Sequence, residues 1–391
     1  MSYKYLVLGS GMQGTAGGYD LAAHGDAESV VMADISLAQA QKAADWINRL
    51  LKKPIAKPLQ LNAKDGTALR SAFKGINGIF SATSYELNLE ITKAAIEAGA
   101  SMVDLGGNTP VVLSQLKLHE QALAKNISII PDCGLAPGLG NTLASYGISQ
   151  MDRCDDVQVR CGGLPQTPRP PLDYKLVFSV RGLTNEYFGK AWVIRDEKIA
   201  EIETFSELEE IDFPKPIGRC EAFTTTGGTS TCPWTYQGKV KNFVYKTVRY
   251  PGHFEKIKCM MDLGLLDPDP IEVGVGENKV KVAPREVFHT VVPPRISFPE
   301  DKDLVVLRTT CTGVKNGKPM SVTYDLLDYH DEATGFSAME RSTAYPAALT
   351  LILSVRGKNK KGVQPLEVAL DNETFMKEIG SHGLKISSLL R

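Results

Sequence analysis

The sequence predicts an α/β protein in which a doubly wound parallel sheet is followed by a second, mixed sheet. The chain is then expected to return to the first domain. Over the first 135 residues, short apolar β-rich runs alternate with stretches of helical periodicity, a pattern typical of right-handed βαβ units. After about residue 150, runs rich in Thr, Tyr, Val and Gly indicate substantial antiparallel pairing. We therefore place the predicted domains at residues 1–137, 138–340 and 341–391.

The predicted elements of the first domain follow one another in a regular order. The expected strands read YLVLG, SVVMAD, GIFSAT, ASMVDLGG and ISIIPDCG, and the expected helices include residues 37–51, 88–99 and 113–125. In the second part, KNGK at 315–318 lies between two predicted strands and carries Asn-Gly, a strong hairpin signal. A helix is predicted near 341–356, and the terminal stretch after it is expected to pack back on the first domain.

Composition indicates an ordinary globular protein. The chain has 391 residues, of which 43% are hydrophobic and 23% charged, and its formal net charge is −1. Because basic residues are not in excess, nothing points to nucleic acid or an anionic membrane as a partner. The longest apolar runs, such as 347–355, are too short to span a bilayer, and no signal peptide is expected. We therefore expect a cytoplasmic protein.

Cysteine and histidine form no pattern of a metal site. The seven cysteines are scattered and never form a Cys-x-x-Cys pair, which favours reduced thiols and argues against a thiolate zinc site. His24 and His119 lie on predicted helices and are expected at the surface. We therefore expect no bound metal.

A glycine fingerprint follows the first predicted strand and opens the first predicted helix. Gly9 would permit a tight turn, Gly11 would let the backbone approach a pyrophosphate, and Gly14 would let the helix pack against the strand. Asp34 ends the second strand, where a carboxylate accepts hydrogen bonds from ribose hydroxyls and repels a 2′-phosphate. The pattern predicts a Rossmann domain that binds NAD rather than NADP. Met12 and Ile35, next to these positions, are included in the predicted cofactor site.

Further cofactor contacts follow from the expected fold, because ligands bind at the carboxyl ends of the strands. Asn62, Ala63 and Asp65 end the third strand and are candidates for the adenine side. Ala82 and Thr83 end the fourth strand and are candidates for the nicotinamide ribose. For all five residues, the alternative is that they are ordinary loop residues without a cofactor contact.

Longer motifs resemble the saccharopine dehydrogenase superfamily, and most closely its lysine 6-dehydrogenases. They read VDLGG, PDCGLAPG, DYKLVFSVRGL, GGTST and YKTVRYPGH, and the likeness covers nearly the whole chain. The resemblance implies a substrate-binding and dimerisation domain inserted after the Rossmann domain, and a homodimer. Two departures concern the substrate. Ala136 stands where saccharopine reductases carry Asp, whereas Lys175 and Arg181 match the saccharopine reductase pattern better than the lysine enzyme's.

The motifs contain residues suited to the chemistry of an amino-acid amine. Asp104 ends the fifth strand and could hold a substrate ammonium, or cap the following loop. His253 suits a proton shuttle, because only His titrates near neutral pH unaided, although a core or capping role is commoner. Lys175 is a candidate acid–base group or carboxylate partner. These three are the predicted catalytic residues.

The predicted substrate contacts come from three segments. Tyr85 could reach the nicotinamide ring and the substrate, or pack against the helix that follows. Arg249 could bind a substrate carboxylate, or form a structural ion pair. The loop TGGTST offers N–H groups and three hydroxyls as a carboxylate cradle, with a plain turn as the alternative. Its hydroxyls belong to Thr229, Ser230 and Thr231.

Three functions remain open at this point. The leading hypothesis is NAD-dependent oxidation of the ε-amine of L-lysine to 2-aminoadipate 6-semialdehyde and ammonia. The second is a saccharopine-type enzyme acting on another N-linked amino acid, which a larger site admitting a glutamate moiety would favour. The third is an NAD-binding sensor without catalysis, because a Rossmann fold does not by itself guarantee chemistry.

Overall fold

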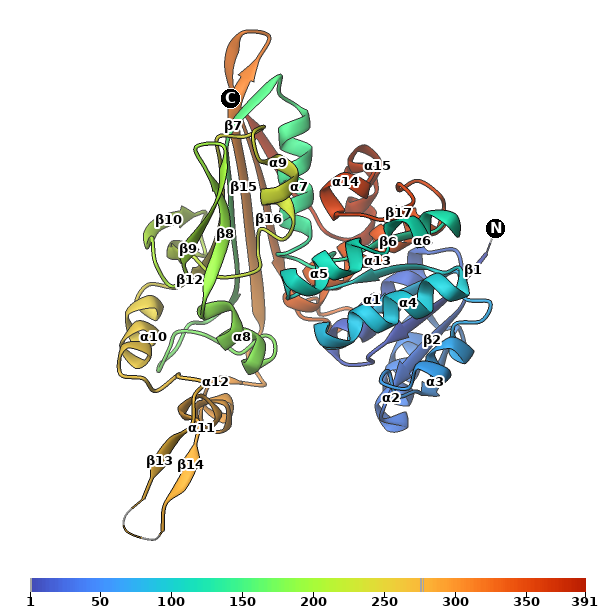
Figure 1. The fold of residues 1–391 in the computed structure, drawn as a ribbon, viewed down its shortest axis with the longest axis horizontal. Coiled ribbons are helices and arrows are strands. Elements are labelled where there is room, and N and C mark those ends of the chain that lie inside the picture. The colour runs from blue at the N-terminus through green and yellow to red at the C-terminus, as the bar shows by residue number, and fades with distance from the viewer. Residues whose placement is uncertain (1, 275, 277) are drawn as a thin grey trace.

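The computed structural model describes residues 2–274, 276 and 278–391. Two lobes lie side by side, each built around its own sheet (Figure 1). Among these residues, no helix is both long and apolar enough to cross a lipid bilayer.

The first lobe contains a seven-stranded sheet in the order β17-β6-β5-β4-β1-β2-β3, and every strand pair is parallel. The strands are β1 (Tyr3–Leu8), β2 (Ala27–Asp34), β3 (Ala56–Gln60), β4 (Gly78–Ser81), β5 (Ser101–Asp104), β6 (Ser128–Ile130) and β17 (Gly362–Val363). The chain runs from β1 outward to β3 and then returns to β4 on the other side of β1. The predicted doubly wound sheet is therefore confirmed, with its switch point between β1 and β4.

Both faces of this sheet are covered. In β1, Tyr5 and Val7 belong to one buried cluster, and Leu6 and Leu8 belong to another. Successive side chains of a strand point to opposite faces, so an unbroken apolar run indicates a strand covered on both sides. The covering elements are α1 (Met12–His24), α2 (Leu37–Leu51), α3 (Gly66–Ala72), the 3-10 turn η1 (Tyr85–Leu87), α4 (Asn88–Ala98), α5 (Thr109–Leu116) and α6 (His119–Ala124).

The second lobe contains a mixed sheet in the order β10-β11-β12-β7-β15-β16-β18, with β8 and β9 branching from β12. Only β12 and β7 pair in parallel along this path. The strands are β7 (Arg153–Pro165), β8 (Lys190–Arg195), β9 (Lys198–Glu203), β10 (Glu209–Phe213), β11 (Gly218–Phe223), β12 (Asn242–Arg249), β15 (Asp303–Lys315), β16 (Lys318–Tyr329) and β18 (Ile386–Leu390). The predicted hairpin joins β15 to β16, and Asn316 and Gly317 have φ values of +50° and +72°.

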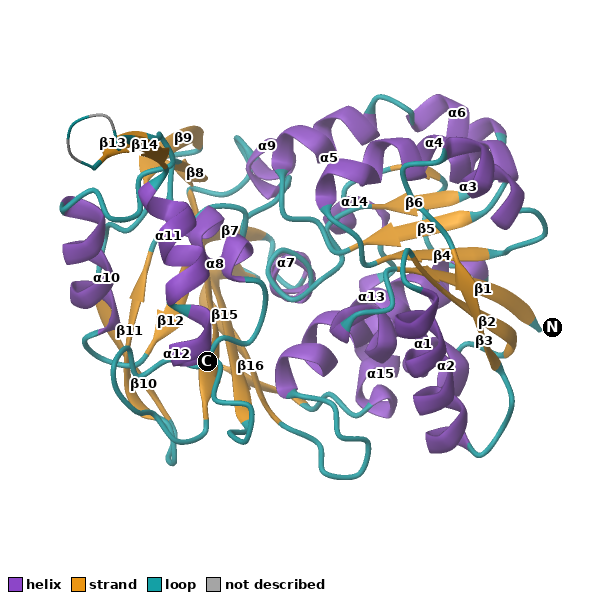
Figure 2. Cartoon of the chain, turned by 90° about the horizontal axis from the view of Figure 1, so that it is seen from below, coloured by secondary structure: helices purple, strands orange, loops and turns teal. Residues whose placement is uncertain are grey.

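Short helices complete the second lobe. They are α7 (Leu139–Ser149), α8 (Val180–Tyr187), α9 (Cys232–Tyr236), α10 (His253–Asp262), α11 (Pro284–Val291) and α12 (Pro293–Ile296). A two-stranded hairpin of β13 (Ile271–Val273) and β14 (Val280–Val282) projects from the body (Figure 1). Helix α7 packs on β7 and β15 and lies between the lobes (Figure 2).

The C-terminal segment divides between the lobes. Helix α13 (Ala338–Val355) starts with a capping box of Ser337 and Glu340 and packs on α1, β4 and β5. It is followed by β17, α14 (Leu366–Ala369), α15 (Asn372–Glu378) and the 3-10 turn η2 (Ile379–His382). The final strand β18 instead pairs with β16 of the second sheet. The expectation that the whole terminal stretch packs on the first lobe is wrong for β18, because its backbone pairs with the open edge of β16.

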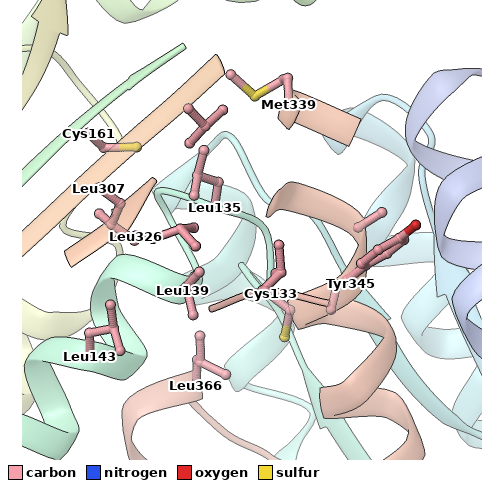
Figure 3. Packing of buried hydrophobic residues seen from close by; sticks show 14 of the residues in the cluster. Cys133, Leu135, Leu139, Leu143, Cys161, Leu307, Leu326, Met339, Tyr345 and Leu366 are labelled. Atoms are coloured by element: carbon pink, nitrogen blue, oxygen red, sulfur yellow. The ribbon is translucent and has the colours of Figure 1, made fainter. Parts of the chain in front are cut away.

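One apolar cluster runs from the first lobe into the second. It contains Tyr345 of α13, Leu139 of α7 and Leu307 of β15, all nearly inaccessible to solvent. Figure 3 shows these side chains together with Cys133 and Leu366 at the junction. The two lobes are thereby held together by a common core on one side.

Candidate active site

The loop between β1 and α1 is shaped by two of its three glycines. Gly9 has φ +84°, and a Cβ there would lie 2.6 Å from the Ala82 carbonyl oxygen. A Cβ on Gly14 would lie 1.7 Å from the Gly9 carbonyl oxygen. A Cβ on Gly11, by contrast, would meet no protein atom within 4 Å. The fold itself therefore requires Gly9 and Gly14, whereas Gly11 leaves open space at the N-terminus of α1, where a pyrophosphate would lie.

A cavity of about 250 Å³ adjoins this loop at the carboxyl ends of β1, β2 and β4. Its lining includes the predicted residues Gly9, Asp34, Ile35, Asn62, Ala63 and Thr83. The Asp34 carboxylate is held by the backbone N–H groups of Ser10 and Ser36, each at 2.9 Å. Fixed in this way, it faces a cavity suited to an adenosine. Lys64, which the sequence reasoning did not single out, lines the same cavity.

The remaining predicted cofactor residues lie at or beside this site. Met12 is the first residue of α1 and is 54% exposed. Ala82 lies directly under Gly9, where its carbonyl oxygen limits the space for a side chain. Asp65 is not among the residues lining the cavity, and its carboxylate accepts hydrogen bonds from Thr67 and Ala68 at the N-terminus of α3. Asp65 is therefore a helix cap, because its carboxylate is occupied by these backbone donors.

A wide cleft opens between the lobes, beyond the carboxyl ends of β4 and β5. A cavity of about 680 Å³ is lined by Tyr85, Gly106 and several residues of α8 and α11. A second cavity of about 250 Å³ reaches deeper, to residues of β7 and β12. Both are lined by Gly107, Phe178 and Glu186, so they adjoin. In a doubly wound fold this edge receives the nicotinamide, so the cleft is the candidate substrate site.

Arg249 lines the deep cavity and is the most buried charged group of its wall. The residue is 3% exposed, and its guanidinium lies over the Tyr174 ring, 4.8 Å from the centroid. Nη1 donates to the Val248 carbonyl at 2.9 Å, whereas Nε has no hydrogen-bond partner among the described residues. A buried guanidinium with a free N–H is costly unless an anion binds it. The predicted role of Arg249 as a carboxylate partner fits this geometry.

Glu186 lines both cavities and is the second charged residue of the deep site. Burial raises the pKa of its carboxyl to about 7, and the positive charge of Arg249 opposes this rise only in part. A carboxyl that titrates near neutral pH in a cleft suits general acid–base catalysis. Sequence reasoning missed Glu186, because nothing in its local sequence distinguishes it from a surface glutamate on a short helix.

Basic residues surround the wide end of the cleft. Arg181 and Glu286 form a two-pronged ion pair, with distances of 2.8 and 2.6 Å. Arg285 lies over the Phe188 ring, 4.0 Å from the centroid, and its Nη2 lacks a partner among the described residues. The predicted Tyr85 lines the same cavity. The cleft therefore has guanidinium groups at both ends.

Two predicted catalytic residues lie outside the cleft and make hydrogen bonds within the second lobe. The imidazole of His253 is 1% exposed and contacts the Tyr187 hydroxyl and the Leu172 carbonyl, at 3.0 and 3.3 Å. Burial, helped by the charge of Arg249, lowers its pKa to about 3. Lys175 donates to the carbonyls of Ser297 and Phe298, at 2.9 and 2.6 Å. Neither residue lines the cleft cavities, so the structure does not bring either of them to the candidate site.

Asp104, the third predicted catalytic residue, lies beneath the cleft. Its carboxylate is 1% exposed and accepts hydrogen bonds from the backbone of Gly106 and Asp132 and from the Gln115 side chain. Three donors already contact this buried carboxylate, and Asp104 is not among the residues lining either cleft cavity. Its role is to position Gly106, which lines the wide cavity.

The TGGTST loop binds carboxylates, but they belong to this chain. Ser230 donates to Asp132, and Thr231 donates to Glu367 at 2.9 Å. Thr229 donates to the Trp192 carbonyl at 2.8 Å. These hydroxyls join the second lobe to Asp132 and the C-terminal segment and do not line the cleft. The sequence correctly suggests a carboxylate cradle, but it cannot show which carboxylate fills it.

Comparison with known proteins identifies the family. Residues 5–130 match the saccharopine dehydrogenase NADP binding domain, and residues 134–384 match the saccharopine dehydrogenase C-terminal domain. A saccharopine dehydrogenase [NADP(+), L-glutamate-forming] of Saccharomyces cerevisiae is 26% identical over 70% of this chain and 60% of its own length. A carboxyaminopropylagmatine dehydrogenase of Synechocystis is 22% identical over 97% of this chain and 96% of its own.

A solved structure of the Saccharomyces cerevisiae saccharopine dehydrogenase (L-Glu forming) shares the fold, with a TM-score of 0.79 at 19% identity and full coverage of both chains. In sequence, the chain spans about half the length of the first curated relatives it matches, between 48% and 60%. The family domains cover nearly all of residues 5–384, including the pyridine-nucleotide domain with its glycine loop. The chain belongs to the saccharopine dehydrogenase family.

Proposed function

We propose that the protein is a pyridine-nucleotide-dependent dehydrogenase of a secondary amine that links two carboxylate-bearing moieties, as saccharopine does. The observation that carries this proposal is the deep cavity, where Arg249 has an unpaired N–H and Glu186 has a pKa of about 7. The name saccharopine dehydrogenase agrees with this substrate class. The name carboxyaminopropylagmatine dehydrogenase agrees with an N-linked secondary amine, although its agmatine part carries no carboxylate.

The size and charge of the cleft favour an extended substrate over free lysine. The wide cavity of about 680 Å³ adjoins the deep one of about 250 Å³. Arg249 would bind one carboxylate in the deep cavity, and Arg285 would bind a second at the wide end. Guanidinium groups suit this task because they bind carboxylates through two parallel hydrogen bonds. L-lysine carries one carboxylate and would leave the second guanidinium without a partner.

Glu186 is the proposed acid–base group. An ammonium cannot release a hydride, so the carboxylate of Glu186 first takes one proton from the substrate nitrogen. A nicotinamide held by the glycine-loop site would supply the acceptor for the hydride of the carbon attached to that nitrogen. Water then adds to the resulting C=N bond, and Glu186 returns its proton to the nitrogen as the C–N bond breaks. With the oxidised nicotinamide as hydride acceptor, one secondary amine and one water thereby give a carbonyl compound, a primary amine, the reduced nicotinamide and one proton.

The residues of the glycine loop fit a dinucleotide, and we propose NAD as the cofactor. The fixed carboxylate of Asp34 lines the adenosine cavity, and a 2′-phosphate beside it would be repelled. Lys64 is the residue of that cavity that could offset this repulsion. Replacing Asp34 with Ala is expected to lower the KM for NADP and raise that for NAD. If NADP is instead the native cofactor, Lys64→Ala raises the KM for NADP at least tenfold.

A second candidate function, oxidation of the ε-amine of L-lysine, is favoured by one observation. Ala136 lines the deep cavity, at the position where the resemblance assigns an Asp to saccharopine reductases. The homodimer expected from the resemblance stays a prediction, which light scattering of the purified protein would check.

The deciding experiment measures absorbance at 340 nm at alkaline pH with saccharopine, L-lysine and L-ornithine, each with NAD and with NADP. The proposal expects a rise with saccharopine or a related N-linked dicarboxylic amine, together with a primary amino acid as product. A rise with lysine alone, accompanied by ammonia, would overturn it in favour of the second candidate. Turnover of no amine, despite tight dinucleotide binding, would favour a sensor.

A further inference from the structure

Three titratable side chains meet on the far end of α1, away from the cleft. Asp20 and His24 are four residues apart on this helix, and His382 ends η2 near the C-terminus. One potential ligand atom from each lies within 4.8 Å of the other two. The spacing i, i+4 places two side chains on one helix face, and the fold adds the third from the C-terminal segment.

The Asp20 carboxylate is fully buried and only partly satisfied. Oδ2 pairs with His382 Nδ1 at 2.7 Å. Oδ1 has no hydrogen-bond partner among the described residues, although it lies 3.9 Å from His24 Nε2. A buried carboxylate oxygen without a donor is costly, and this distance is too long for a hydrogen bond. The Oδ1 oxygen of Asp20 therefore faces His24 without a hydrogen-bond donor from the described part of the chain, and a cation bound between the two side chains would neutralise its charge.

We propose that Asp20, His24 and His382 form a binding site for a divalent transition-metal ion of the zinc class. In a tetrahedral zinc site, ligand atoms at about 2.0–2.1 Å from the metal lie about 3.3 Å from one another. The Asp20 carboxylate lies next to both imidazoles, with Oδ2 at 2.7 Å from His382 Nδ1 and Oδ1 at 3.9 Å from His24 Nε2. Side-chain rotations, with release of the proton shared by Asp20 and His382, would bring one ligand atom from each residue to this spacing. The mixed imidazole and carboxylate ligands favour zinc, cobalt or nickel over magnesium or calcium.

The surroundings agree with three protein ligands and one open position. The His24 side chain is 34% exposed, whereas those of Asp20 and His382 are nearly inaccessible. Water could therefore reach the metal from the His24 side and supply a fourth ligand. The site lies outside the cleft, and its ligands come from α1 and from a segment 362 residues away. We assign it the role of tying the C-terminal segment to the cofactor-binding lobe.

The test titrates zinc into the 391-residue chain, free of any histidine tag, after removal of metals with EDTA. Cys259, an exposed thiol, is replaced by Ser in every sample so that it cannot bind the metal. A competing chromogenic chelator reports affinity and stoichiometry. His24→Ala and Asp20→Asn are compared with His330→Ala, which removes a histidine away from the cluster. Circular dichroism confirms that each variant is folded.

One zinc ion per chain is expected for the parent protein and for His330→Ala. The affinity should fall at least tenfold in His24→Ala and Asp20→Asn. Cobalt bound to the parent protein should give the visible absorption bands of a four- or five-coordinate ion, and these bands should disappear in His24→Ala. Absence of stoichiometric binding by the parent protein would overturn the proposal, as would equal affinity in all variants.

Discussion

Replacing Glu186 with Gln tests the acid–base role and does so with two independent measurements. The pKa of this carboxyl is raised from 4.5 to about 7, chiefly by burial. Gln keeps the shape of the side chain but cannot take a proton. General acid–base groups contribute typically about 10²–10⁴-fold to turnover. We therefore expect the turnover number of Glu186→Gln to fall by about this factor, and the decline in parent activity below about pH 7 to disappear.

The same pKa predicts a change in stability that needs no substrate. The pKa of Glu186 in the folded state exceeds its pKa in the unfolded chain, so its contribution to the free energy of unfolding is most favourable below about pH 4.5. It is lost as the pH rises through 7. The difference corresponds to about 3 kcal/mol. Above pH 7, Glu186→Gln should therefore have a free energy of unfolding up to about 3 kcal/mol greater than that of the parent, and near pH 4 the two should agree.

The assay is denaturant unfolding at pH 4 and pH 8, combined with a pH–rate profile of the dehydrogenase reaction. Glu86→Gln is the matched control, because Glu86 lines the wide cavity but is exposed. The control should change stability by no more than about 0.5 kcal/mol. Near-parental turnover in Glu186→Gln, with an unchanged acidic limb and no gain in stability at pH 8, would refute the reasoning.

Three further predictions follow from the site. Gly11→Ala should leave the unfolding midpoint nearly unchanged yet weaken dinucleotide binding at least tenfold, because its Cβ meets only open space. Gly14→Ala should instead destabilise the fold itself. Thermal unfolding measures the loss of stability, and fluorescence titration with NADH measures the loss of dinucleotide binding, so the two measurements together distinguish these variants. Arg249→Lys should raise the KM for a dicarboxylic amine at least tenfold, because it keeps the charge but loses the paired N–H groups. His253→Gln should leave the neutral part of the pH–rate profile unchanged. In the parent, the lowered pKa of about 3 means that His253 contributes its full stability above about pH 6.5 and loses that contribution on acidification. The free energy of unfolding of the parent should therefore fall between pH 7 and pH 5. Denaturant unfolding of His253→Gln at the same two pH values should lack this decrease.

Features that depend on residues close together in the chain could be predicted from the amino-acid sequence alone. The alternation of strands and helices predicts the parallel sheet, and Asn316-Gly317 predicts the hairpin, because positive φ is a property of the residues in the turn. Gly9 and Asp34 are recognisable because their spacing follows from one βαβ unit. Within such a unit, distance along the chain fixes distance in space.

Which candidate side chains line the cleft depends on the tertiary structure. His253 and Ser230 belong to specific motifs, yet one is buried against Tyr187 and the other donates to Asp132. Glu186 has no motif, and its raised pKa arises from burial between the lobes. The cluster of Asp20 with His382 joins residues at opposite ends of the chain. Charge, burial and hydrogen bonding depend on neighbours in space, and for these residues packing between distant segments supplies the neighbours.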